Sequence, residues 1–186
     1  MKLLPGRISH GLLTLILGLT WACGPDRIEF SEMPIGSDAE LMSDTGKREK
    51  LSASFKPATF LFFGFSRCPD FCPMTLHRLD SLLANEPALK AKFRLLFVSV
   101  DSENEKPENL RGFLSAFPYA RGYMGSKAEI AELEKKFGAY SAKETKGISH
   151  SLYLYVLNPA GKVIYLLRHD DPPEKILGVI RQAAAN

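Results

Sequence analysis

The sequence has little excess charge of either sign, and its N-terminal apolar run is too short to span a bilayer easily. Its 186 residues include 24 Lys and Arg against 21 Asp and Glu, and without Lys2 and Arg7 the basic residues number 22, which leaves a net charge of +1. This balance gives no electrostatic reason to expect a nucleic-acid partner. Internal repeats and low-complexity segments are also missing, and the length fits one domain better than two.

The N-terminus has the pattern of an export signal. A basic start precedes an apolar core, Leu12 to Leu19, that is too short to span a bilayer easily. Leu19 to Cys23 resembles a bacterial lipoprotein signal, in which the cysteine becomes the lipidated first residue; an ordinary cleaved signal and an uncleaved anchor are the alternatives. We therefore expect a signal peptide over 1–22, a tether over 23–38 and one domain over 39–186, anchored to a membrane of the bacterial cell envelope and facing the periplasm.

Cysteine is scarce, with three residues in the chain, and two of them lie close together at Cys68 and Cys72. The aromatic-rich run over 59–63 before them follows a proline and predicts a buried strand. The leucines after them recur at helical spacing, at Leu76, Leu79, Leu82 and Leu83. The cysteine pair is therefore expected at a strand-to-helix junction.

The sequence predicts that this helix starts at Pro69, with Cys68 as its N-cap, because a proline at the first helical position loses no hydrogen bond. A helix N-terminus favours a thiolate, so Cys68 should be more acidic than a free thiol. Cys72 lies four residues on and would share the same helical face. The two sulfurs could then form a disulfide or bind one soft metal ion. Pro73 is expected to bend or tighten the helix just after its first turn.

Downstream, strand and helix patterns alternate. A nearly continuous apolar run predicts a central strand over 93–100, with Asp101 at its carboxyl end. Pro107 opens a helix, Tyr123–Met124 suits a short strand, and Ser126 with Glu129 forms a capping-box pattern for a third helix that ends at Gly138.

The remaining elements complete an α/β order. Two antiparallel strands are expected over 152–157 and 162–167, followed by a last helix capped by Asp171, and a turn at 44–46 predicts a small hairpin at the domain edge. In open sheets of this class, ligands bind beyond the carboxyl ends of the strands. Cys68 and Asp101 both fall there.

The spacing of the cysteines does not match a thioredoxin redox site, which has two intervening residues rather than three. The stretch Cys68-Pro69-Asp70-Phe71-Cys72-Pro73, with Gly64-Phe65-Ser66 before it, resembles the signature of the Sco/SenC family. The resemblance covers the chain from about Phe55 to the C-terminus. It implies a thioredoxin-like fold with an N-terminal hairpin and one inserted helix, and the order of predicted elements agrees. Members of this family are membrane-tethered copper proteins that help assemble the CuA centre of cytochrome c oxidase.

The resemblance also implies a ligand set. It adds His150 to Cys68 and Cys72, because a His-Ser pair precedes a Tyr-containing strand in the family. Two thiolates and an imidazole suit Cu(I), and Cu(II) with an added ligand. Zinc favours a fourth ligand, for which the sequence offers no obvious Cys or His. Asp101 is expected either to cap a loop or to support the ligands or contact a partner, and Asp70 either to favour the helix N-terminus or to help position the site.

Two functional classes remain open. The first is a copper metallochaperone that delivers copper to the CuA-bearing subunit of cytochrome c oxidase, with periplasmic copper carriers or thioredoxin-like reductants as further partners. The alternative is an enzyme, a thiol-disulfide oxidoreductase that uses Cys68 and Cys72 to reduce the copper-ligand cysteines of that subunit. Peroxide reduction is disfavoured because it needs neither the second cysteine nor the histidine. A purely structural disulfide is disfavoured because it would leave the helix-start position unused.

Overall fold

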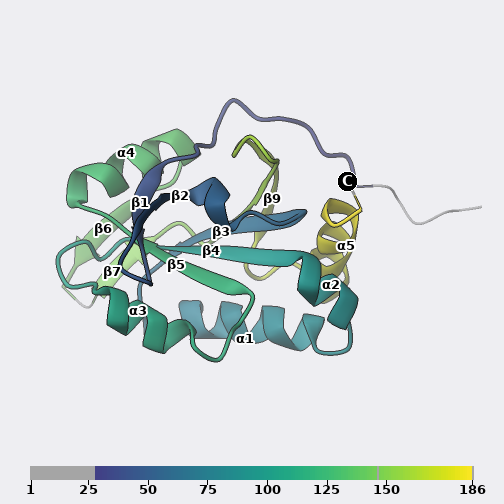
Figure 1. Ribbon diagram of the computed structural model, residues 1–186, viewed down its shortest axis with the longest axis horizontal. Helices are drawn as coiled ribbons and strands as arrows, with labels where there is room; N and C mark the ends of the chain where they lie inside the picture. The colour runs from purple at the N-terminus through teal and green to yellow at the C-terminus, as the bar shows by residue number, and fades with distance from the viewer. Residues whose placement is uncertain (1–27, 146, 186) are drawn as a thin grey trace, which may run out of the picture.

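The computed structural model describes residues 28–145 and 147–185. A seven-stranded sheet with helices on both faces forms the domain (Figure 1). The strand order is β2-β1-β5-β4-β3-β8-β9, and β6 and β7 form a separate two-stranded sheet. The strands are β1 (Glu40–Ser43), β2 (Arg48–Lys50), β3 (Ala58–Gly64), β4 (Phe93–Ser99), β5 (Ala120–Met124), β6 (Ser141–Glu144), β7 (Gly147–His150), β8 (Tyr153–Leu157) and β9 (Val163–Arg168).

The helices cover the sheet unequally. They are η1 (Leu51–Ser54, a 3-10 turn), α1 (Phe71–Leu83), α2 (Pro87–Lys92), α3 (Pro107–Leu114), α4 (Lys127–Phe137) and α5 (Pro173–Ala183). Side chains of α1, α2, α3 and α5 share one hydrophobic cluster, whereas α4 and η1 contribute to the other. In Figure 1, α1 and α3 lie below the sheet and α4 lies above it. The fold is the predicted α/β arrangement.

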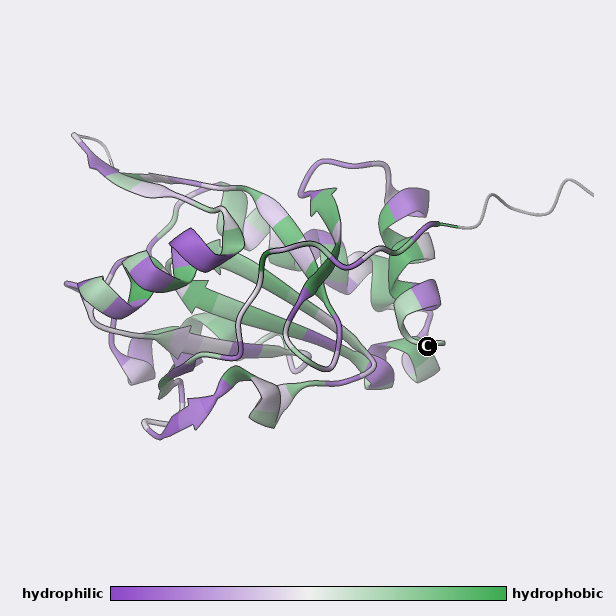
Figure 2. Ribbon diagram, turned by 90° about the horizontal axis from the view of Figure 1, so that it is seen from above, coloured by the Kyte–Doolittle hydropathy of each residue, from purple (hydrophilic) through white to green (hydrophobic). Residues whose placement is uncertain are grey.

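β3 is an interior strand of the sheet and contributes side chains to both hydrophobic clusters. It pairs in parallel with β4 and antiparallel with β8, and all seven of its residues are buried. Because successive side chains alternate between faces, Phe60 and Phe62 join the α1 cluster while Leu61 and Phe63 join the α4 cluster. The central strands stand out as hydrophobic in Figure 2. Burying one such phenylalanine stabilises the fold by about 1.5–3 kcal/mol, so the strand that leads to the cysteines is rigidly held.

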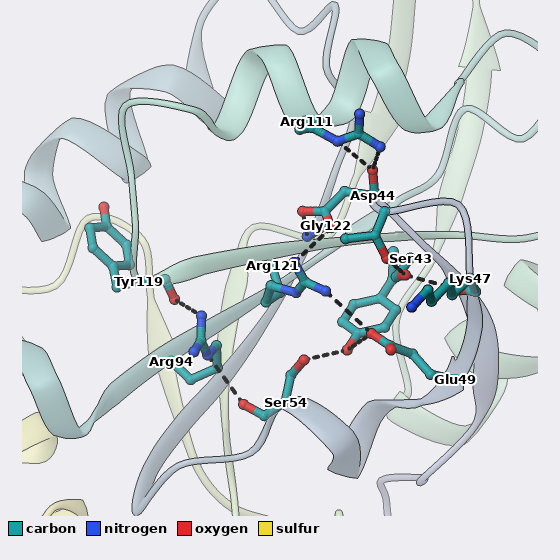
Figure 3. A network of polar contacts seen from close by, with 12 residues as sticks. Ser43, Asp44, Lys47, Glu49, Ser54, Arg94, Arg111, Tyr119, Arg121 and Gly122 are labelled. Carbon is teal, nitrogen blue, oxygen red and sulfur yellow. Dashed lines mark hydrogen bonds and ion pairs between the residues drawn. The ribbon is translucent and has the colours of Figure 1, made fainter.

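The N-terminal hairpin is confirmed, but it extends the sheet rather than decorating its edge. β1 pairs with β2 and also with β5, both antiparallel. Asp44 at its turn fixes it in place, as Figure 3 shows: Arg111 donates to the Asp44 carbonyl at 2.9 and 2.5 Å, and the Gly122 amide donates to the Asp44 carboxylate at 3.0 Å. Arg121 adds an ion pair at 3.1 Å. One acidic residue thus ties the turn to α3 and β5.

The predicted start of α1 is wrong. The helix begins at Phe71 with Asp70 as its N-cap, and Cys68 and Pro69 precede it. Pro73 explains the shift: in a helix that started at Pro69 its ring would meet the carbonyl four residues earlier, whereas as the third residue of α1 it loses no bond. Cys68 and Cys72 therefore do not share a helical face.

Other boundaries differ in smaller ways. α5 is capped by Pro172, and Asp171 instead accepts a hydrogen bond from the Arg168 amide at 2.8 Å, so the expected Asp171 cap is also wrong. The sequence did not predict α2, β6 or β7. The capping box of α4 is confirmed, and Gly138 ends that helix with a φ of 61°.

The N-terminal segment of the described chain lies along β9. The Ser31 and Met33 amides donate to β9 carbonyls at 3.1 and 2.8 Å, and the Val163 amide donates to the Ile35 carbonyl at 3.0 Å. Part of the expected tether thus packs on the domain, while the boundaries over 1–22, 23–38 and 39–186 stay predictions. The expected signal and Cys23 lie outside the described residues. Within these residues, no helix combines the length and the apolar character that crossing a membrane requires.

Candidate metal centre

Cys68, Cys72 and His150, the ligand set that the family resemblance implied, lie together at the end of β3. Their two sulfurs and an imidazole nitrogen all lie within 4.8 Å of one another. The Cys72 sulfur is 3.8 Å from Nε2 of His150. Two segments 78 residues apart in the chain therefore place three soft donors around one point.

Cys72 is the most deeply seated of the three. It is the second residue of α1 and is fully buried. Gly64, the last residue of β3, makes room for it: a Cβ at Gly64 would lie 2.9 Å from the Cys72 sulfur and 2.6 Å from Cζ of Phe97. This close approach of backbone and sulfur requires glycine. The sequence showed Gly64 only as part of the family signature.

Cys68 forms the accessible side of the group. It is half-buried in the segment between β3 and α1, and its amide donates to the Phe65 carbonyl at 3.2 Å. It lines a groove of about 230 Å³ between the start of α1 and the stretch of residues 147–152. The other residues that line it include Asp70, Phe71, Ile148, His150 and Leu152. A reagent or partner entering this groove meets Cys68 before Cys72.

The two thiols differ in acidity. A hydrogen bond from Cys72 lowers the pKa of Cys68 to about 5 despite its partial burial, and the backbone N–H groups of Cys72 and Asp70 act in the same direction. The same hydrogen bond, together with burial, raises the pKa of Cys72. Without a metal, Cys68 is therefore the thiolate at neutral pH and Cys72 is the thiol that donates to it.

His150 is the last residue of β7 and is buried. Its Nδ1 lies 3.0 Å from the Ser151 carbonyl, which accepts a hydrogen bond from Nδ1–H, so Nε2 is the ring nitrogen that faces the sulfurs. The rings of Phe62 and Phe65 pack against the imidazole edge to face, each with a centroid distance of 6.0 Å. A histidine held this way is a preorganised ligand.

Asp101 lies beside the site and does not reach the ligand group. It is buried and accepts hydrogen bonds from Arg67 and from the Asn104 side chain, the latter at 2.8 Å. Burial opposes ionisation, but these bonds lower the pKa of Asp101. The carboxylate thus holds the side chain of Arg67, the residue directly before Cys68, and a role of Asp101 in supporting the ligands or contacting a partner stays a prediction.

Asp70 and the two other described histidines lie further out. Asp70 is exposed and makes no side-chain capping bond, although it lines the groove beside Cys68. His77 is exposed and packs on Phe117, and half-buried His169 packs on Phe71, with centroid distances of 5.0 and 5.3 Å. None of them lies in the Cys68, Cys72 and His150 group.

The donor set fits a soft monovalent ion. Two sulfurs and one imidazole match the preference of Cu(I). Across residues 28–145 and 147–185, no fourth Cys, His or carboxylate joins the group, so the closed tetrahedron typical of structural zinc cannot be completed from these side chains.

Comparison with known proteins gives a consistent result. The model of the family described as SCO1/SenC matches residues 30–185. An SCO2-like protein of Rickettsia conorii is 25% identical over 189 aligned positions, which cover 94% of this chain and 91% of the relative. The chain spans about half the length of some mitochondrial relatives, 49% for the SCO2 homologue of Danio rerio.

Solved structures agree in fold. The copper-bound structure of Bradyrhizobium japonicum ScoI is 27% identical, with a TM-score of 0.70 over 80% of this chain and 99% of the other. BsSco, described as a member of the Sco family of cytochrome c oxidase assembly proteins with a disulfide switch, is 25% identical, with a TM-score of 0.67 over 84% and 98%. The thioredoxin-like fold predicted from the sequence is confirmed.

Proposed function

The chain belongs to the SCO1/SenC family, and from this premise we propose that it is a copper metallochaperone. It binds one copper ion through Cys68, Cys72 and His150 and delivers the ion to the CuA centre of cytochrome c oxidase. The observation that carries the proposal is the convergence of two sulfurs and one ring nitrogen within 4.8 Å. The copper bound to ScoI supports copper binding, and the description of BsSco as a member of a cytochrome c oxidase assembly family supports delivery to the oxidase.

The geometry suits a chaperone because the three donor atoms are held in place while one side of the group stays accessible to a partner. Cys72 and His150 are buried and fixed by packing, whereas Cys68 faces a groove. An incoming thiolate can therefore approach the ion from the Cys68 side, and a three-coordinate ion can accept it before a protein ligand leaves. Copper passes on by ligand exchange without release to water.

Titration of the reduced full chain, in detergent, with Cu(I) against a chromophoric chelator tests the ligand set. Wild type should take up one equivalent, and His150→Ala should lose most of its affinity. His77→Ala is the matched control, because it removes a histidine that lies outside the group. The proposal fails if wild type does not compete with the chelator, or if His150→Ala binds as wild type does.

A second candidate, thiol-disulfide oxidoreductase, is favoured by the unequal acidity of the thiols. The Cys68 thiolate would attack a partner disulfide and displace one partner sulfur as a thiolate. Cys72 would then lose its proton and attack the mixed disulfide, which releases the partner as a dithiol and leaves a Cys68–Cys72 disulfide. A thioredoxin-like reductant would restore the pair. This exchange should survive His150→Ala, which separates it from copper binding.

We also propose that the domain acts in the bacterial cell envelope, on the periplasmic side of a membrane to which a lipid on Cys23 anchors it. The signal-like pattern of residues 1–22 supports this location. Metabolic labelling with a radioactive fatty acid tests it: wild type should be labelled and Cys23→Ser should not. An unlabelled wild type would favour the ordinary cleaved signal or the uncleaved anchor.

A further inference from the structure

Of the three side chains in the group, Cys68 is the one that no helix or strand carries. Cys72 lies in α1 and His150 in β7, whereas Cys68 lies in the segment of residues 65–70 between β3 and α1. The backbone of this segment therefore needs other contacts to keep the Cys68 sulfur beside its two neighbours. These contacts come from the loop of residues 100–106 that follows β4.

Glu105 makes several of these contacts with one carboxylate. Its carboxylate accepts the Ser66 amide at 2.9 Å and the Ser66 hydroxyl at 2.6 Å, and it also accepts the Ser99 hydroxyl at 2.8 Å. Ser99 is fully buried at the end of β4, so it gives the carboxylate a fixed support. Hydrogen bonds to an ionised acceptor are about twice as strong as neutral ones.

The loop that carries Glu105 is itself well ordered by hydrogen bonds. The Glu105 amide donates to the Asp101 carbonyl at 2.9 Å, and the Val100 amide donates to the Gly64 carbonyl at 2.8 Å. Asp101 also binds the Arg67 side chain. Both residues before Cys68 are thus bound to carboxylates of one loop, but only Ser66 is held through its backbone.

We propose that Glu105 is a positioning residue for Cys68: by fixing Ser66 to the end of β4, it keeps the Cys68 sulfur at the distance from Cys72 and His150 that copper binding and disulfide formation require. The copper part rests on the proposed function. The disulfide part does not, because it needs only the two cysteines. Glu105 touches neither sulfur, so its effect is transmitted through the backbone of residues 66–68.

Glu105→Ala, compared with wild type in the full detergent-solubilised chain, provides the test. Hydrogen-bond partners of metal ligands are worth about 10–100-fold in metal affinity, and because Glu105 acts on Cys68 through Ser66, the Cu(I) dissociation constant should rise by about tenfold, the lower end of that range. The Cys68–Cys72 disulfide should also become about tenfold less stable against glutathione, a rise in potential of about 30 mV, because the released sulfur is less often beside its partner.

Two further variants control for charge and for hydrogen bonding. Glu108→Ala removes the same charge from an exposed position in the first turn of α3 and should change neither quantity. Glu105→Gln keeps an acceptor for the Ser66 amide and supplies a donor for the Ser66 hydroxyl. It should therefore keep most of the wild-type copper affinity and most of the disulfide stability. If Glu105→Ala does not fold, Ser66→Ala, which removes one of the three bonds, should give a smaller shift in the same directions.

Urea unfolding of each variant distinguishes positioning from a merely structural role. If Glu105→Ala lowers stability while the folded protein keeps the wild-type copper affinity and disulfide stability, the proposal is overturned. If wild type itself fails to bind Cu(I), the proposed function fails, and the disulfide measurement still decides the role of Glu105. An unchanged disulfide equilibrium would then reject it.

Discussion

The starts of α4 and α1 use the same physics for opposite purposes. At α4, the Ser126 hydroxyl accepts the Glu129 amide at 3.3 Å, the Glu129 carboxylate accepts the Ser126 amide at 2.7 Å, and this last bond is the main reason that the pKa of Glu129 falls to about 2. At α1, Asp70 makes no side-chain cap, and the depressed pKa belongs to the Cys68 thiol. The α4 start satisfies its own N–H groups and stabilises the fold, whereas at the α1 start the Cys72 side chain, helped by the N–H groups of Cys72 and Asp70, stabilises the Cys68 thiolate.

Removing a sulfur at the start of α1 should have the largest effect. Cys72→Ser replaces a soft donor by a hard one, so we expect loss of the copper that wild type retains through gel filtration with a competing chelator. Ser126→Ala, at the other helix start, should retain copper fully. Retention by Cys72→Ser would show that the α1 start is not a metal site and would break the comparison.

Thiol reactivity should show the next largest effect. Because the pKa of Cys68 is lowered to about 5, its alkylation rate by iodoacetamide should be nearly constant from pH 6 to 8 and fall about tenfold per pH unit below 5. The sign follows from the thiolate being the nucleophile. Cys72→Ala removes the donating thiol and should move the midpoint upward. A wild-type midpoint near 8.5, the value of an unperturbed thiol, would contradict the activation of Cys68.

Gly64→Ala should destabilise the domain by about 1–3 kcal/mol, because the added methyl overlaps the Phe97 ring and the Cys72 sulfur. The free energy of urea unfolding measures the effect. Gly112→Ala in α3 is the matched control: nothing lies within 4 Å of its added carbon, so helix propensity should make it neutral or stabilising. Equal effects of the two changes would mean that Cys72 is not seated as tightly as described.

Ser126→Ala tests whether the start of α4 serves stability alone, and it should have the smallest effect. Loss of an N-cap costs about 1 kcal/mol, so urea unfolding should report a decrease of that size, with copper affinity and Cys68 alkylation unchanged. A change in either site property would show that the start of α4 is coupled to the metal centre rather than serving stability alone.

The sequence predicted what local patterns determine. β3 and β4 followed from continuous apolar runs, and α4 from its capping box and Gly138. The start of α1 was misread because Pro69 carries a strong start signal, and the later Pro73 overrides it. β6 was missed because Ser141–Glu144 is short, polar and largely exposed, and its one strand partner is β7.

Less of the site than of the fold could be predicted from the sequence. The cysteine pair was evident from its spacing, but His150 entered only through the family resemblance, since its approach to the sulfurs depends on how remote segments pack. Glu105 gave no sequence signal, because its bonds to Ser66 span 39 residues. Contacts of this kind are tertiary, and a single sequence contains no pattern for them.

The packing of the described N-terminal residues on β9 also bears on self-association. One outer strand of the main sheet is β9, and Ser31, Met33 and Ile35 form hydrogen bonds with the backbone of its first two residues, Val163 and Ile164. The other is β2, which is three residues long and carries Arg48, Glu49 and Lys50. A short charged strand and a partly covered one both discourage edge-to-edge pairing, so in the described part of the chain each outer strand of the main sheet offers a neighbouring copy only a short length for pairing.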